Sequence, residues 1–161
     1  MKKLSLAFLA VLVSVIVLLS TSTTVLADLA TKEPFSATMT YGWWTSIERV
    51  WIDEEGVMHV RGEFVMTISG SIDGTVALTV NENFFGDPRS GDFQAKGNIT
   101  ASDGDVYLIS SDMTLITGTL SGTFVILGTG SCKGIHVTGT VTATPYPNQE
   151  DLEGTKLTTH P

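Results

Sequence analysis

The chain has 161 residues, of which 42% are hydrophobic, and its formal net charge is −8 at pH 7. A charge this negative repels nucleic acids and anionic membrane surfaces, so it excludes both as natural partners. The single cysteine, Cys132, excludes an intramolecular disulfide, and the folded state must therefore rely on its hydrophobic core.

Residues 1–27 have the layout of a secretory signal peptide. Lys2 and Lys3 precede the apolar run Leu4–Leu19, and a Ser/Thr patch then leads to a small-residue cleavage pattern that ends at Ala27. We expect cleavage before Asp28, and a mature protein that is secreted or resides in the cell envelope outside the cytoplasm. An uncleaved membrane anchor is the alternative, although the run is slightly short of the ~20 residues that a spanning helix needs. It would be the chain's one attachment to a membrane.

After a linker at 28–34, residues 35–160 are predicted to form a single β-domain. Apolar and polar residues alternate with a period of two, most clearly in Phe93–Ala101 and Ile135–Ala143, and turn residues such as Asp73-Gly74 separate the runs. The connections are short, so neighbouring strands should pair antiparallel. The predicted strands lie near 35–41, 43–53, 57–69, 75–84, 92–101, 105–117, 119–127 and 135–144, with a short ninth near 154–159.

Four glycines, Gly62, Gly97, Gly122 and Gly139, lie in mid-strand on the apolar face. Glycine weakens a strand, and its recurrence at equivalent inward positions indicates places where strands bend sharply, as closed barrels require. We therefore predict an eight-stranded antiparallel up-and-down β-barrel, preceded by the apolar signal helix, rather than an open sandwich. An interior of this size is filled by side chains or holds one small ligand.

Glu82 is the charged residue that fits its strand least well. It lies between Val80 and Phe84 on a face that is otherwise apolar. Turned into the barrel, the carboxyl would have a raised pKa and could act as an acid or base, or anchor a ligand. The alternative that we favour is a strand end or bulge at 81–83 that frees the side chain.

Three tryptophans, Trp43, Trp44 and Trp51, lie in or before one predicted strand. With Glu82 and Phe84 they are the candidate ligand-binding residues, because large aromatic side chains line ligand cavities. The alternative is that they plug the barrel end or pack in the core.

The other polar groups are better explained as surface or turn residues than as catalytic or metal-binding residues. His59, Arg61 and Glu63 alternate on the polar face of one strand, where an acid–base pair or metal site is conceivable but a solvated outer surface is favoured. Asp53-Glu54-Glu55 does not match a calcium loop, and we expect a solvated turn. Asn98-Ile99-Thr100 is an N-glycosylation pattern. No metal or cofactor is predicted.

The sequence Gly130-Ser-Cys-Lys-Gly134 has the spacing of a nucleophile elbow. That motif needs a helix after the nucleophile. A strong strand pattern follows Cys132 instead, so we predict a glycine-rich turn. Walker, dinucleotide-binding and H-E-x-x-H motifs and paired catalytic carboxylates are also absent, which lowers the expectation of an enzyme.

Two stretches carry a resemblance to a known family. They are WIDEEGVMHVRG (51–62), continuing in SGSIDGT (69–75), and GTLSGTFVILGTGSCKGIHVTGTV (118–141), followed by LEGTKL (152–157). They resemble small exported prokaryotic proteins with an allene oxide cyclase/dirigent-like, calycin-like barrel, many of which have no assigned role. The resemblance implies an eight-stranded antiparallel barrel with a largely apolar interior. Plant members include a cyclase of an oxidised fatty acid and dirigent proteins that steer radical coupling, but none of their functional residues can be matched here.

The sequence therefore predicts an exported barrel that binds a small apolar ligand without catalysis or serves as an envelope-associated module. One alternative is a cofactor-independent cyclase or isomerase of an oxidised lipid, with Glu82 as acid or base. The other is a structural barrel that forms homo-oligomers.

Overall fold

The computed structural model describes residues 30–86, 90–143 and 149–159. The predicted signal peptide, 1–27, lies outside them. Residues Lys32–Thr158 form one compact unit, and the description that follows concerns this unit.

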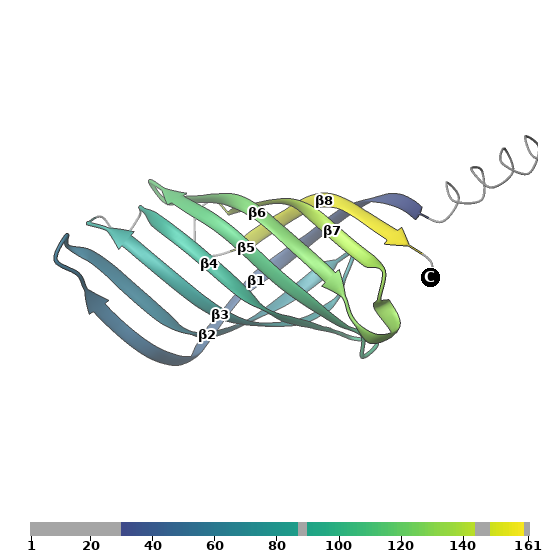
Figure 1. Ribbon diagram of the computed structural model, residues 1–161, viewed down its shortest axis with the longest axis horizontal. Helices are drawn as coiled ribbons and strands as arrows, with labels where there is room; N and C mark the ends of the chain where they lie inside the picture. The colour runs from purple at the N-terminus through teal and green to yellow at the C-terminus, as the bar shows by residue number, and fades with distance from the viewer. Residues whose placement is uncertain (1–29, 87–89, 144–148, 160–161) are drawn as a thin grey trace, which may run out of the picture. The chain divides into compact units, whose positions relative to one another are not determined.

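The compact unit is a closed antiparallel β-barrel in which each strand lies beside its neighbours in the sequence (Figure 1). The predicted all-β, antiparallel up-and-down architecture is therefore confirmed. A 3-10 turn, η1 (Gly130–Cys132), precedes β7. The strands are β1 (Ala30–Ile52), β2 (Val57–Gly70), β3 (Gly74–Phe85), β4 (Gly91–Ala101), β5 (Val106–Ile116), β6 (Thr119–Gly128), β7 (Ile135–Ala143) and β8 (Gln149–Thr159).

The strand boundaries differ from the sequence prediction at the two ends of the chain. The predicted strands 35–41 and 43–53 are one long strand, β1, whose pairing with β2 shifts register between Thr40 and Trp43 and twice more beyond it. Residues 30–34, predicted as linker, also belong to β1. The predicted short ninth strand is the second half of β8, which closes the ring against β1.

Side-chain hydrogen bonds join β1 to β8 where the ring closes. Ser36 Oγ donates to Glu153 Oε1 over 2.7 Å, and Thr38 Oγ1 donates to Asp151 Oδ1 over 3.0 Å. These bonds lie on exposed residues, so they contribute less than the apolar interior that the same two strands cover.

The mid-strand glycines lie where the backbone of a neighbouring strand crowds the inner face. A Cβ atom on Gly97 would lie 1.9 Å from the carbonyl oxygen of Ala77, and one on Gly139 would lie 2.0 Å from that of Glu153. Real Cβ atoms do not approach carbonyl oxygens this closely, so a side chain would force the paired strands apart. The glycines thus permit the strong coiling with which the sheet closes into a narrow barrel.

We predict that Gly97→Ala destabilises the protein by about 2–3 kcal/mol, because β3 and β4 must separate to admit the methyl group. The control is Asn98→Ala, a neighbouring substitution at an exposed position of the same strand, which should change the free energy of unfolding by less than about 0.5 kcal/mol. Urea unfolding followed by tryptophan fluorescence measures both. Equal midpoints for Gly97→Ala and the unmodified protein would contradict the role given to this glycine.

Candidate functional site: two buried glutamates in an apolar barrel

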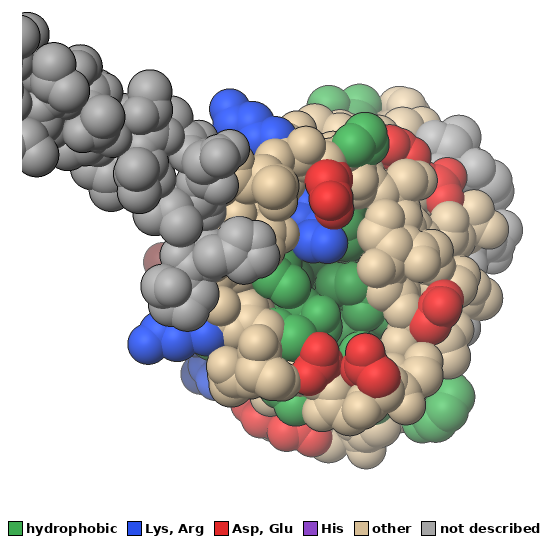
Figure 2. Space-filling model, turned by 90° about the vertical axis from the view of Figure 1, so that its right-hand side faces the viewer, with side chains coloured by type: hydrophobic (Ala, Val, Ile, Leu, Met, Phe, Trp, Pro, Cys, Tyr) green, Lys and Arg blue, Asp and Glu red, His purple; other side chains and the backbone are tan. Residues whose placement is uncertain are grey.

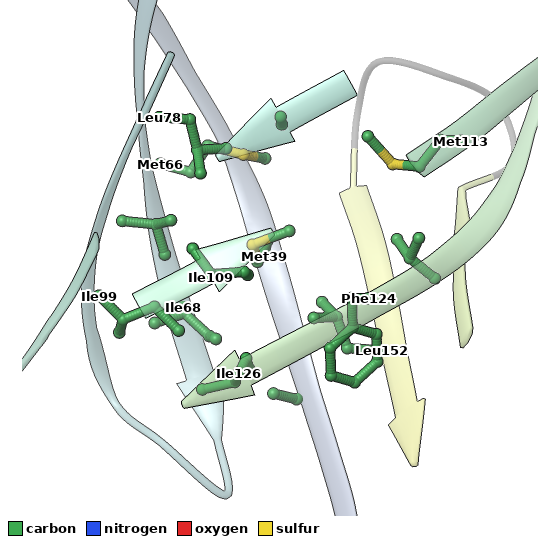
Figure 3. Close-up of a cluster of buried hydrophobic side chains, with 14 of the residues drawn as sticks. Met39, Met66, Ile68, Leu78, Ile99, Ile109, Met113, Phe124, Ile126 and Leu152 are labelled. Atoms are coloured by element: carbon green, nitrogen blue, oxygen red, sulfur yellow. The ribbon is translucent and has the colours of Figure 1, made fainter. Parts of the chain in front are cut away.

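The inner face of the barrel is apolar because alternate residues of every strand point inward. Figure 3 shows such side chains from several strands converging on one interior, among them Met39, Ile109 and Phe124. The innermost layer is tightly packed: Val76, Ile99, Leu120, Ile126, Val137 and Leu152 have no exposed surface.

A cavity of about 30 Å³ lies within this interior. That volume is enough for a water molecule or two but not for a lipid chain. Three of its lining residues, Met39, Met66 and Met113, are methionines, whose unbranched side chains adapt readily to a changed shape. The other lining residues are Phe64, Leu78, Val80, Glu82, Phe93, Ala95, Ile109, Ser111, Leu120, Phe124, Val141, Glu150 and Leu152.

Glu82 points into the barrel. Its strand, β3, continues to Phe85, and residues 81–83 pair without interruption with β2 on one side and β4 on the other. The favoured sequence interpretation, a strand end or bulge that frees the side chain, was therefore wrong. The regular register places Glu82 opposite the inward residues Val60 and Phe93, and only 8% of its surface is exposed.

A second glutamate, Glu150, shares this interior, and sequence reasoning did not identify it. It lies two residues before the buried Leu152 on β8, so the alternation turns it inward, and it too is 8% exposed. The available signal was the Glu150–Leu152 alternation, which is inconspicuous within the run Gln149-Glu-Asp-Leu-Glu153. The prediction began the last strand at 154, and this residue therefore fell outside every predicted strand.

The surroundings of Glu150 disfavour the ionised form of its carboxyl group. Burial, followed by the repulsion of Glu82, raises the pKa of the Glu150 carboxyl to about 7. Among the described residues that line the cavity, Glu82 and Glu150 are the charged ones, and no lysine or arginine accompanies them.

The aromatic residues predicted to bind a ligand lie on both faces of the barrel sheet. Trp44 packs edge-on against Phe64, with ring centroids 5.3 Å apart, and Phe84 packs in the same way against Phe93 at 5.5 Å. Phe64 and Phe93 line the cavity, so Trp44 and Phe84 border the site without lining it. Trp43 pairs with Val65 on the outer face and is 65% exposed.

Trp51 belongs to a cluster on the outer face of the β1–β2 hairpin. Its ring stacks on His59 at 4.5 Å, and His59 in turn contacts Asp53 Oδ2 at 2.9 Å and Asn83 Oδ1 at 2.7 Å. The Asp53 hydrogen bond, followed by the one to Asn83, raises the pKa of His59. Asp53 also accepts hydrogen bonds from the backbone N–H groups of residues 55 and 57. These contacts stabilise the end of the hairpin and link it to β3 through Asn83.

The inner face of this hairpin is open to solvent beside Glu82. Ile47, Val50 and Ile52 pair with inward residues of β2, yet they are 57%, 55% and 69% exposed. Directly paired residues share one face of a sheet, so this apolar strip continues the inner wall of the barrel past Glu82.

Cys132 lies near the opposite end of the barrel, in η1, and β7 rather than a helix follows it. Its Sγ lies 2.6 Å from Oδ2 of Asp105 and 3.3 Å from the hydroxyl of Tyr107. Burial, followed by the Asp105 contact, raises the pKa of the thiol, which therefore stays protonated and is a poor nucleophile. Figure 2 faces this end, where hydrophobic side chains floor a depression with charged side chains on its rim.

The described residues offer no alternative centre built on a metal. In residues 30–86, 90–143 and 149–159, no three His, Cys, Asp or Glu side chains gather as metal ligands would. Arg61, one of the polar-face candidates, instead forms an ion pair with Glu48 at 3.0 Å. The same ranges contain no helix with the length and hydropathy of a membrane span.

Comparison with known proteins defines the fold and leaves the function open. No family model matches the chain, and no curated protein matches it either. Among solved structures, it is similar to a protein of unknown function from the DUF3224 family of Shewanella oneidensis MR-1, with a TM-score of 0.59 and 14% sequence identity. The similarity covers 82% of this chain and 98% of the other, so nearly the whole of that protein shares the barrel architecture.

Proposed function

We propose that this protein is an exported binding protein that holds a small molecule with an apolar body inside its barrel. The layout of residues 1–27 supports export, since a charged start, an apolar run and a small-residue cleavage pattern follow one another. The binding role is carried by one observation: Glu150 is buried beside Glu82 in an interior that is otherwise apolar. A few polar groups converging on an apolar cavity are typical of small-molecule sites.

Entry of a ligand requires the methionines to move. The cavity of about 30 Å³ must enlarge before an aliphatic chain fits. Met39, Met66 and Met113 line it, and each can change rotamer without breaking a hydrogen bond. The chain of such a ligand would run inward from the glutamates, between the methionines, toward the packed layer around Leu78 and Phe124.

The titration of Glu150 tests the basis of this proposal. Because burial raises its pKa from 4.5 to about 7, the folded protein retains a proton that the unfolded chain has lost between these values. Stability should therefore fall as pH rises from 4.5 to 7, by on the order of 3 kcal/mol, and stay lower above pH 7. Glu150→Gln should abolish this loss. The control is Glu63→Gln, an exposed glutamate on β2.

The measurement is carboxyl-carbon NMR of protein labelled at glutamate Cδ, together with urea unfolding at several pH values. A resonance that titrates near pH 7 and disappears in Glu150→Gln confirms the buried acid. A spectrum in which every glutamate titrates near pH 4.5 would contradict it.

Binding itself is tested with a neutral probe, hexan-1-ol, titrated into the full-length protein. We expect saturable shifts of the methyl resonances of Met39, Met66 and Met113, with a smaller response from Met58, which does not line the cavity. Ala95→Leu fills part of the lined volume and should weaken binding at least tenfold. Ala77→Leu, at an exposed position of β3, should leave binding unchanged. Absence of saturable binding by the unmodified protein would contradict the proposed function.

Proton transfer is a second candidate function, and the pKa of about 7 for Glu150 favours it. A carboxyl that titrates near working pH is well suited to general acid or base catalysis. The resemblance to allene oxide cyclase-like barrels suggests isomerisation or cyclisation of an oxidised lipid. Glu82→Gln and Glu150→Gln should then each lower turnover of such a lipid by at least 100-fold, measured by mass spectrometry of the product. Unchanged turnover in both variants would exclude this function.

A further inference from the structure

We propose that two copies of this protein pair along the free edge of β1, antiparallel about a two-fold axis, with Glu48 of each copy opposite Arg49 of the other. The pairing goes beyond the proposed binding function and does not depend on it. Three features carry it: the length of β1 relative to β8, a β-bulge that turns both charged residues to one face, and the aliphatic residues that flank them.

The end of β1 has a neighbouring strand on one edge only. A side-chain hydrogen bond joins Thr38 of β1 to Asp151 of β8, and two other contacts between these strands keep the same register. In that register Gln149, where β8 begins, lies opposite Thr40. β1 continues past this point to Ile52, and among the described residues its remaining part pairs with β2 alone (Figure 1). Its other edge therefore presents backbone N–H and C=O groups that another strand could pair with.

The exposure of this part of β1 agrees with a missing neighbour. Every residue from Thr45 to Val50 is exposed. Where β8 lies beside β1, in contrast, the inward residues Phe35, Ala37 and Met39 are buried. A long edge strand with exposed apolar side chains is a site at which proteins associate through strand pairing.

A β-bulge turns two oppositely charged neighbours to the same face. Adjacent residues of a regular strand face opposite ways, but the pairing of β1 with β2 shifts register between Ile47 and Arg49. Arg49 lies directly opposite Arg61, and Oε2 of Glu48 lies 3.0 Å from Nε of the same arginine. Glu48 and Arg49 therefore both lie on the outer face, while Ile47 and Val50 on either side of them face inward.

This arrangement is complementary to itself. In an antiparallel pair centred between residues 48 and 49, Glu48 lies opposite the partner's Arg49, and Ile47 lies opposite the partner's Val50. The two-fold axis repeats both contacts. Directly opposed residues share a face, so the ion pairs form on the outer face and the aliphatic contacts on the inner one. A shift by one residue would place Glu48 opposite its own copy, or Arg49 opposite its own copy, and like charges would repel.

Arg49 is the residue that gains most from the partner. Within the described residues it has no ion pair, and its guanidinium lies 4.4 Å from the centre of the Trp51 ring. It also lies opposite Arg61, a like charge, and the carboxylate of Glu48 is engaged with that arginine. A single copy thus groups two arginines with one glutamate. The partner's Glu48 would supply the missing negative charge.

The test reverses these charges in the full-length protein. Glu48→Arg brings arginines opposite arginines in a self-pair, and Arg49→Glu brings glutamates opposite glutamates, so each variant should associate at least tenfold more weakly than the unmodified protein. An equimolar mixture of the two should associate again, because every arginine then faces a glutamate of the other variant. Lys96→Glu, an exposed charge reversal on β4, is the control and should change nothing.

Sedimentation velocity over a range of concentrations measures association, and urea unfolding checks that each variant is folded. The unmodified protein should show a monomer–dimer equilibrium with a dissociation constant on the order of 10–100 µM, since a short strand ladder is a small interface. Independently of any variant, the backbone N–H groups of residues 46–52 should exchange with deuterium more slowly as protein concentration rises.

Three outcomes would overturn the inference. The first is an unmodified protein that is monomeric at every concentration, which would leave this edge to a strand from a different protein. The second is association that both charge reversals leave unchanged, as association through residues 4–19 would be. The third is a mixture of the two folded variants that stays monomeric, which would exclude the register centred between residues 48 and 49.

Discussion

Closure of the sheet is the constraint on which the rest of this structure depends. Once β8 pairs beside β1, every strand must turn alternate side chains into a single enclosed space. Paired strands lie so close together that positions such as Gly97 and Gly139 have no room for a Cβ atom. What remains inside is a narrow interior in which packed aliphatic side chains leave about 30 Å³. The chemistry of any ligand would therefore depend on the few residues in that space that can change rotamer or form a hydrogen bond or ion pair.

Glu150 is poorly explained as a structural element. A buried carboxyl with a raised pKa reduces the free energy of unfolding at neutral pH, and a glutamine or a leucine at position 150 would avoid that cost. Cys132 illustrates the opposite case, because its thiol and the carboxylate of Asp105 satisfy one another at the far end of the barrel. Departures from favourable packing that find no structural compensation are most often retained for function.

Most of the strands could be predicted from the sequence. The candidate site could be predicted only in part. Strict alternation in Phe93–Ala101 and Ile135–Ala143 predicted β4 and β7 closely, because each turns one unbroken apolar face inward. The inward direction of Glu82 could not be settled, since it depends on whether pairing continues through Asn83, and only the partner strands decide that. Glu150 was missed because the last strand was predicted to begin only at residue 154, whereas β8 begins at Gln149.

The long β1 strand explains why one side of the site is open. Register shifts at Thr40/Trp43, Trp44/Ser46 and Ile47/Arg49 bend β1, yet it keeps pairing with β2 as far as Ile52. The hairpin thus exposes Val50 and Ile52 to solvent, on the face that continues to Glu82. Under the binding function proposed above, an apolar ligand would meet this strip before it reached Glu82. The three aliphatic side chains that this geometry leaves in water would then form the first contact surface for such a ligand.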